Sequence, residues 1–161
     1  MLGAGIGYGI TKCISYASGR IGNTGSIGNT CPSEGGSKTE VYYRTMSQSD
    51  YDYLRMTEEL PSTNETFISP TESFSSNYNG VTVRFEVNNG TTNSLLEIGV
   101  GNNTNQSIRD YGILPQVKSG WNINNAFFKG EGLQTNIGLG KGSALEIFNS
   151  NIVKFNAVGG K

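Results

Sequence analysis

The stretch that decides the fold runs from Glu65 to Val87 and reads ETFISPTESFSSNYNGVTVRFEV. Its second half alternates apolar and polar residues, which is the period of a half-buried β-strand. Its first half places Ser69 and Thr71 on either side of Pro70, directly after the apolar pair Phe-Ile. The stretch therefore predicts two strand ends separated by a turn that presents hydroxyl groups.

The strand GVTVRFEV is the clearest in the sequence. We expect Thr82, Arg84 and Glu86 on its polar side. Its apolar side is formed by Val81, Val83, Phe85 and Val87. The Asn-Asn-Gly sequence at 88–90 predicts a turn directly after it.

Upstream, residues 41–44 (VYYR) are rich in strand-forming residues. A capping-box pattern that begins at Ser47 predicts a helix to about Met56. Tyr51 and Leu54 lie three residues apart and are expected on its buried side.

Downstream, residues 98–125 predict a long loop, and loops of this length often serve binding. The sequence AFFKGEGLQTNIGLG that follows predicts one strand, whose alternating set is Leu133, Thr135, Ile137 and Leu139. Glu131 is in phase with this set, so its carboxylate is expected to face inward unless a glycine bulge shifts the register. Gln134 alternates to the opposite side and carries no strong functional claim.

Near the C-terminus, Ser143 and Glu146 form a second capping-box pattern for a short helix, SALEIFN. The segment NIVKFNAV predicts a last strand through Val153 and Phe155. The expected fold class is α+β, with strands dominant.

The length of 161 residues suits one domain with a core of its own. We expect residues 40–161 to form that domain, because residues 1–39 are Gly-rich, repeat the tetrad IGNT and are typical of a linker. Their apolar start is shorter than the roughly 20 residues of a membrane span. We expect this lead segment to join the domain to something larger upstream. Cys13 and Cys31 lie within it, either as a disulfide or as two unrelated thiols.

The composition excludes several classes of function. The chain has no histidine, which removes Ser-His and Cys-His nucleophiles and His-ligated zinc sites. A net charge of −1 and the absence of Lys or Arg runs argue against a nucleic-acid binder that neutralises phosphates. Any chemistry must use carboxylates, hydroxyls, Arg, Lys or a cofactor.

Arg44, Ser69 and Glu131 are the candidate chemical residues. A guanidinium at a strand end can hold a phosphate with two hydrogen bonds, although an ordinary exposed Arg gives the same pattern. Turn or cap chemistry explains Thr71 more readily than it explains Ser69. An inward carboxylate at Glu131 is costly unless it is paired or used. Glu146 is discounted as a catalyst, because the second capping box gives it a structural role.

The order Arg, Ser, Glu resembles that of ADP-ribosyltransferases of the Arg-Ser-Glu type. The segments VYYRTMSQSDYDYL, ETFISPTESFSSNYNGVTVRFEV and NAFFKGEGLQTNIGLGKGSALEIFN resemble the C-terminal toxin domains of Rhs-type polymorphic proteins that ADP-ribosylate elongation factor Tu, the TreTu family. The resemblance covers about Glu40 to Val158 and leaves out the lead segment.

The resemblance implies an ADP-ribosyltransferase fold, in which two small β-sheets with short flanking helices form a cleft for NAD, the substrate, without a metal. Arg44 would hold the NAD phosphates and the nicotinamide ribose, and Ser69 would brace the cleft strand. Glu131 would stabilise the positive charge that develops on the ribose as nicotinamide leaves. The NAD-binding set that it implies is Arg44, Tyr43, Ser69, Thr71, Phe74 and Tyr78. Target recognition would fall to a loop with Trp121, Asn122, Phe127 and Phe128.

Two motifs depart from the family pattern. The usual Ser-Thr-Ser is Ser69-Pro70-Thr71, and the usual Glu-x-Glu or Gln-x-Glu is Lys129-Gly130-Glu131, so the residue that engages the acceptor is unassigned.

The resemblance also implies an antibacterial toxin of interbacterial competition. It would be secreted as part of a larger protein, for example by a type VI secretion system. It would act in the target-cell cytoplasm without stable membrane association. Its partners would be elongation factor Tu, whose modification stops translation, and a cognate immunity protein, with no nucleic acid.

Two other functions stay open at this point. A toxin ribonuclease that acts on tRNA or other RNA can work with Arg, Lys, Tyr and Thr in place of His. A noncatalytic binding or structural β-module also has this composition.

Overall fold

The computed structural model describes residues 38–161 as two small β-sheets surrounded by six short helices. The fold class is therefore mixed, with both helices and strands, as the sequence predicts. The IGNT repeat and the question of Cys13 and Cys31 lie outside the described residues, and the division between residues 39 and 40 stays a prediction.

The first sheet, sheet A, is built around the strand that the sequence marks most clearly. In it β3 (Val81–Asn88) lies between β1 (Thr39–Met46) and β7 (Ile152–Gly160), and both neighbours are antiparallel to it. Val83 and Phe85 are fully buried, because this side of β3 faces the core. The predicted strand and its apolar side are confirmed.

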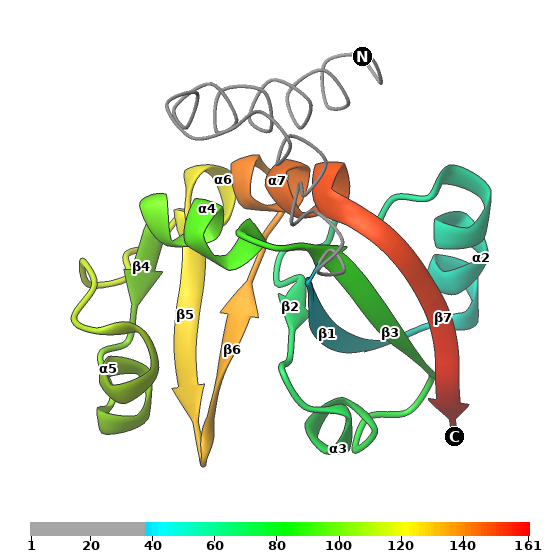
Figure 1. Ribbon diagram of the computed structural model, residues 1–161, viewed down its shortest axis with the longest axis horizontal. Coiled ribbons are helices and arrows are strands. Elements are labelled where there is room, and N and C mark those ends of the chain that lie inside the picture. The colour runs from blue at the N-terminus through cyan, green and yellow to red at the C-terminus, as the bar shows by residue number, and fades with distance from the viewer. Residues whose placement is uncertain (1–37) are drawn as a thin grey trace, which may run out of the picture. The chain divides into compact units, whose positions relative to one another are not determined.

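The second sheet, sheet B, has the order β2-β6-β5-β4. Its strands are β2 (Phe67–Ile68), β6 (Gln134–Gly138), β5 (Ala126–Glu131) and β4 (Gly99–Gly101). The β4–β5 pair is parallel, whereas the β2–β6 and β5–β6 pairs are antiparallel (Figure 1).

The prediction of one strand within residues 126–140 is wrong, because β5 and β6 form a hairpin. Gly132 has φ 64°, a conformation that glycine adopts readily, and it turns the chain together with Leu133. Leu133 is 94% exposed at the tip of the hairpin. The apparent alternation of apolar residues ran across this turn.

Helix α2 (Gln48–Thr57) begins as the capping pattern predicts. The backbone N–H of Asp50 donates to the Ser47 hydroxyl at 3.1 Å, so Ser47 is the N-cap. Leu54 is fully buried on the core side of the helix.

The predicted loop at 98–125 is wrong, because it contains β4 and two helices, α5 (Asn105–Tyr111) and α6 (Trp121–Asn124). A further helix, α4 (Thr91–Glu97), precedes it. These elements are short, and tertiary contacts hold them. The Asn103 amide, for example, donates to the Leu114 carbonyl at 2.8 Å and accepts from its N–H at 3.1 Å. Short elements of this kind leave little periodic signal in a sequence.

Helix α7 (Ser143–Asn151) is correctly predicted, but its capping box is not. The N-cap is Gly142, and no side chain caps the helix, because Ser143 is already the first helical residue. The capping role assigned to Glu146 is therefore wrong, because Ser143 is not the N-cap and the helix has no side-chain capping bond. Leu145 and Phe148 are buried on the core side of the helix.

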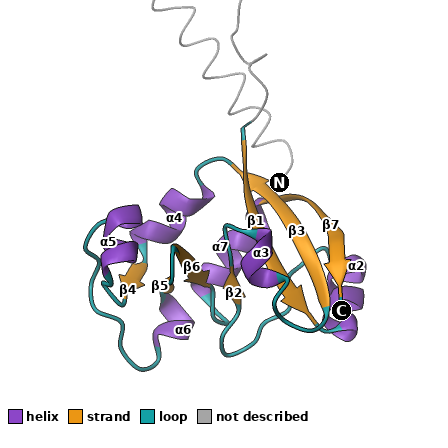
Figure 2. Cartoon of the chain, turned by 90° about the horizontal axis from the view of Figure 1, so that it is seen from below, coloured by secondary structure: helices purple, strands orange, loops and turns teal. Residues whose placement is uncertain are grey.

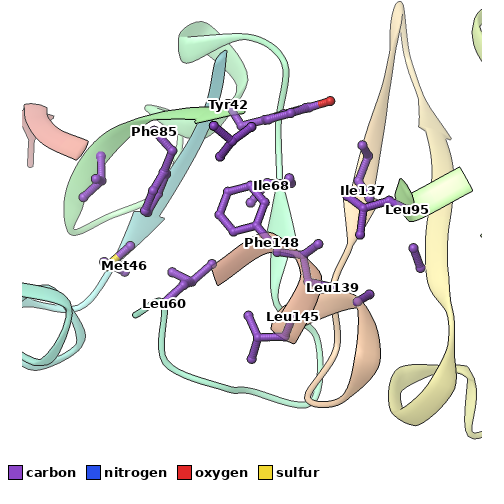
Figure 3. Packing of buried hydrophobic residues seen from close by; sticks show 14 of the residues in the cluster. Tyr42, Met46, Leu60, Ile68, Phe85, Leu95, Ile137, Leu139, Leu145 and Phe148 are labelled. Atoms are coloured by element: carbon purple, nitrogen blue, oxygen red, sulfur yellow. The ribbon is translucent and has the colours of Figure 1, made fainter. Parts of the chain in front are cut away.

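The hydrophobic core lies between α7 and the two sheets. The Phe148 ring packs against the rings of Tyr42 and Phe85 of sheet A, with centroids 6.3 and 5.6 Å apart. Figure 3 shows Ile68 and Ile137 of sheet B in the same cluster. Side chains therefore fill the space between the core-facing sides of the sheets.

Within residues 38–161, no helix combines the length and the apolar character that crossing a membrane requires.

Candidate functional site

Within residues 38–161, one isolated β-bridge connects strands β1 and β2 of the two sheets. The Tyr43 N–H donates to the Ser69 carbonyl and the Ser69 N–H donates to the Tyr43 carbonyl, both at 2.8 Å. Beyond this pair β1 and β2 separate into their own sheets. Ser69 therefore lies at the junction of sheets A and B, at the end of β2 as predicted.

A chain of side-chain hydrogen bonds connects Ser69 to Glu131. The Gln134 amide nitrogen donates to the Ser69 hydroxyl at 2.8 Å and to Asn136 Oδ1 at 2.5 Å. Asn136 Nδ2 then donates to Glu131 Oε2 at 2.7 Å. We call Ser69, Gln134, Asn136 and Glu131 the amide network. It links two of the predicted site residues, which lie 62 positions apart in the sequence, through two residues of β6.

Glu131 does not face the core, contrary to the sequence prediction. In the hairpin Glu131 pairs with Gln134, and Lys129 pairs with Asn136. Directly paired residues project from the same side of a sheet, so these four side chains share one face. The next pair along the hairpin, Gly130 and Thr135, belongs to the other face.

Glu131 is a charged carboxylate with a partner on each oxygen. Its Oε1 forms an ion pair with Lys129 Nζ at 2.6 Å, and its Oε2 accepts from Asn136. Partial burial alone would raise the pKa of Glu131, but the hydrogen bonds from Lys129 and Asn136 and the Lys129 charge lower it overall. The carboxylate is therefore ionised at neutral pH.

Arg44 reaches the junction from the core side of β1. It alternates in phase with the buried Tyr42 and Met46, and its Nη1 donates to the Phe67 carbonyl at 2.7 Å. Within residues 38–161 no carboxylate forms a salt bridge with Arg44. Burial lowers the pKa of Arg44, and the Asp50 charge opposes that effect. The guanidinium bonds to the backbone of β2 and has no described contact with Glu131.

The remaining predicted NAD-binding residues lie around α3 (Glu72–Ser75), which packs against sheet A (Figure 2). Thr71 is the N-cap residue of α3, but its side chain forms no capping hydrogen bond and its hydroxyl donates to Gln134 Oε1 instead. The ring centroids of Phe74 and Tyr78 lie 5.9 Å apart, and Tyr78 is 58% exposed. Thr71 therefore bonds to Gln134 of the amide network, whereas Phe74 and Tyr78 form a separate aromatic pair.

The aromatic residues proposed for target recognition divide between two environments. The rings of Trp121, Phe127 and Phe67 form a cluster with centroids 5.3 to 5.9 Å apart. Phe128 is fully buried, and its ring centroid lies 4.8 Å from that of Tyr111. It therefore cannot serve as an exposed anchor. The reason is strand alternation, which sends neighbouring residues of β5 to opposite sides.

Gln134 and Asn136, the two residues that connect the site, were not predicted as functional from the sequence. A signal was present, because both are polar and alternate with Thr135 and Ile137 along β6. Asn136 is only 1% exposed, and buried amides need hydrogen-bond partners.

A cavity of about 470 Å³ lies elsewhere on the domain, where the C-terminus of α2 approaches β7. Its lining residues are Thr57, Glu58, Glu59, Asn149, Ile152, Val153, Lys154 and Phe155. None of the predicted site residues contributes to it, so the cavity and the amide network are separate features.

Comparison with known families identifies the class of protein. A profile described as the PT3 toxin domain matches residues 38–157, which is most of the chain. The protein is thus a toxin domain of the polymorphic-toxin kind. It belongs to the PT3 toxin domain family. No curated protein matches this chain.

Proposed function

We propose that this toxin domain is a mono-ADP-ribosyltransferase that uses NAD as its substrate. The observation that carries the proposal is the ionised Glu131, held by the amide network that extends from the junction of the two sheets. The proposed fold is the ADP-ribosyltransferase fold, with the NAD site on the side of sheet B that faces away from α7.

The reaction needs a fixed negative charge close to the ribose. The bond between ribose C1′ and the nicotinamide nitrogen breaks, and its electron pair leaves with nicotinamide. A side-chain nucleophile of the target then bonds to C1′ and releases a proton if it carries one. Positive charge develops on the ribose between these events, and a carboxylate in a fixed position stabilises it. Glu131 fills this role without a histidine.

Arg44 supports the proposal through its charge. It is a partly buried cation without a salt-bridge partner in the described part of the chain, and it lies one residue after Tyr43 at the junction. A guanidinium retains several N–H donors when one of them bonds a carbonyl, so it can also bind a phosphate oxygen. Arg44 would bind the NAD phosphates from the edge of sheet A.

The target and the biological setting rest on the resemblance to the TreTu family. On that basis elongation factor Tu is the proposed acceptor, and its modification would stop translation in the target cell. The domain would arrive there by secretion from the producer, which would carry a cognate immunity protein that covers the site.

The test is mass spectrometry of a bacterial lysate treated with the domain and isotopically labelled NAD. We expect one protein, elongation factor Tu, to gain a labelled ADP-ribose, together with release of nicotinamide. The matched control is Glu131→Gln, which keeps the acceptor oxygen for Asn136 and removes the charge. Labelling that persists in the Gln variant would contradict the proposed role of Glu131.

A parallel incubation with tRNA in the absence of NAD separates this proposal from the ribonuclease. Cleavage of the RNA by the wild-type domain, without any labelling of protein in the first experiment, would replace the transferase with the nuclease.

A further inference from the structure

The amide groups of Gln134 and Asn136 have no assigned role in the proposed reaction. Asn136 is almost fully buried, and each end of its amide has one side-chain partner. Its oxygen accepts from Gln134 and its nitrogen donates to Glu131. A buried amide that meets both requirements inside one network is held rigidly.

The direction of the hydrogen bonds in this network is fixed from one end. The Ser69 hydroxyl donates to the Thr71 carbonyl at 3.0 Å, so its oxygen is the acceptor for Gln134. The Thr71 hydroxyl donates to the Gln134 oxygen. Gln134 must therefore present its nitrogen to Asn136, which in turn must present its own nitrogen to Glu131. The Asn136 N–H therefore faces the Glu131 carboxylate because Ser69 and Thr71 fix the orientation of the Gln134 amide.

The two oxygens of Glu131 have partners of different kinds. Oε2 bonds the buried Asn136, whereas Oε1 pairs with Lys129, whose side chain is 40% exposed. The Lys129 ammonium also lies 5.6 Å from the Phe67 ring centroid, which offers it a cation–π interaction when it leaves the carboxylate. A cationic ribose can replace Lys129 at Oε1 without disturbing Oε2.

We propose that Asn136, oriented by Gln134, is a positioning residue that holds Glu131 through Oε2 while Lys129 exchanges for substrate at Oε1. The consequence for catalysis rests on the proposed function, but the effect on Glu131 itself does not.

The electrostatic surroundings make the effect measurable. Lys129 is the charged group that contacts Glu131, and the residues that face it from β6 are neutral. Asp110 of α5 bonds the Thr135 hydroxyl, which lies on the other side of the hairpin. A change in the titration of Glu131 after substitution of Asn136 therefore reports the lost hydrogen bond.

The first experiment measures the titration of Glu131 by carbon-13 NMR of its carboxyl group in Asn136→Leu. We expect a higher midpoint than in the wild type, because a donor to the charged form is lost. The matched control is Asn102→Leu. The Asn102 amide bonds both backbone groups of Gly130, in the same strand, and forms no side-chain hydrogen bond with Glu131. Its midpoint should stay at the wild-type value.

If Asn136→Leu does not fold, Gln134→Leu carries the test, because it leaves Asn136 in place and removes the group that orients it. We then expect a smaller rise in the same direction. A wild-type midpoint in a folded Asn136→Leu protein, or in Gln134→Leu if the first variant does not fold, overturns the inference.

The second experiment compares kinetics. Asn136→Leu should lower kcat by about 100-fold with little change in KM, the usual cost of misplacing a catalytic group. Lys129→Met should lower kcat less than Asn136→Leu does. An equal or larger loss in Lys129→Met overturns the division of roles between the two oxygens. If the wild type has no transferase activity, the proposed function fails, while the NMR titration still decides the position of Glu131.

Discussion

On one face of the β5–β6 hairpin, Phe128 and Ile137 are fully buried beneath neighbouring elements of the core. On the other face, Lys129 and Glu131 each expose about a third of the side chain or more, and they are held by polar contacts. The two faces share one backbone, and strand alternation alone places apolar side chains on one face and polar side chains on the other. The first face contributes most of the stability, whereas the second carries a charged pair whose contribution to stability is small.

The largest expected effect is on the buried face. Phe128→Ala should lower the free energy of unfolding by about 3–5 kcal/mol, because it removes a large ring and leaves a cavity beside Tyr111. Chemical denaturation followed by circular dichroism measures this change. A loss below about 1 kcal/mol would mean that the hairpin does not anchor the core.

On the polar face the expected effect is on activity. Glu131→Gln should reduce ADP-ribosyl transfer by about 100- to 1,000-fold, the range seen when one charge-stabilising group is removed. Its free energy of unfolding should change by no more than about 1 kcal/mol, since an exposed ion pair contributes little. Rates of nicotinamide release and a denaturation curve for the same protein provide both values. A variant that is inactive only because it unfolds would contradict this contrast.

Gly138 tests how closely the aromatic cluster approaches sheet B. A Cβ at this position would lie 2.6 Å from the Trp121 ring and 2.9 Å from the Phe67 ring, so Gly138→Ala has to displace both. We expect a loss of about 1–3 kcal/mol in the free energy of unfolding, as for other overpacked sites. Trp121 is the single tryptophan of the chain, so its fluorescence should also change. An unaltered emission spectrum would show that the rings do not lie against this strand.

The pH dependence of stability sharpens the comparison further. Glu131 has its ordinary pKa of 4.5 in the unfolded chain, and folding lowers this pKa. The carboxylate therefore stabilises the fold fully above about pH 4.5, and this contribution is lost as the pH falls through the lower folded value. The difference in unfolding free energy between wild type and Glu131→Gln should be constant near pH 7 and smaller near about pH 3. A difference that grows in acid would reverse the sign of the shift.

The smallest effect is expected at the tip of the hairpin. Leu133 is 94% exposed, so Leu133→Asn should change the free energy of unfolding by no more than about 0.5 kcal/mol. A loss of more than about 2 kcal/mol would restore the original interpretation of Leu133 as a core residue.

The sequence predicted the fold where one period ran unbroken through an element. The strand at Val81–Asn88 and the helix after Ser47 are of this kind, because each has a continuous pattern or a cap that acts locally. The long loop was predicted wrongly because β4, α5 and α6 are too short to show a period. The hairpin was missed because Gly132 reverses the chain between two segments with the same alternation.

The candidate site was also predicted correctly only where a local sequence pattern determined the position of a residue. Ser69 could be placed at a strand end from Pro70 and its apolar neighbours, and the structure has it there. The direction of Glu131 could not be predicted, since it depends on where the chain turns. The importance of Gln134 and Asn136 was also hidden, because it depends on the contact of Gln134 with Ser69, which precedes it by more than sixty positions, and on the bond from Gln134 to Asn136.

The sequence by itself determined a mixed fold, a chemistry without histidine, and hydroxyl and carboxylate groups at strand ends. Those properties depend on residue type and local period, which any chain carries before it folds. Only the tertiary structure decided which face of the hairpin holds Glu131 and which residues it meets. Strand pairing joins segments that are distant in the chain, and a shift of one residue in that pairing would have sent every side chain to the other face.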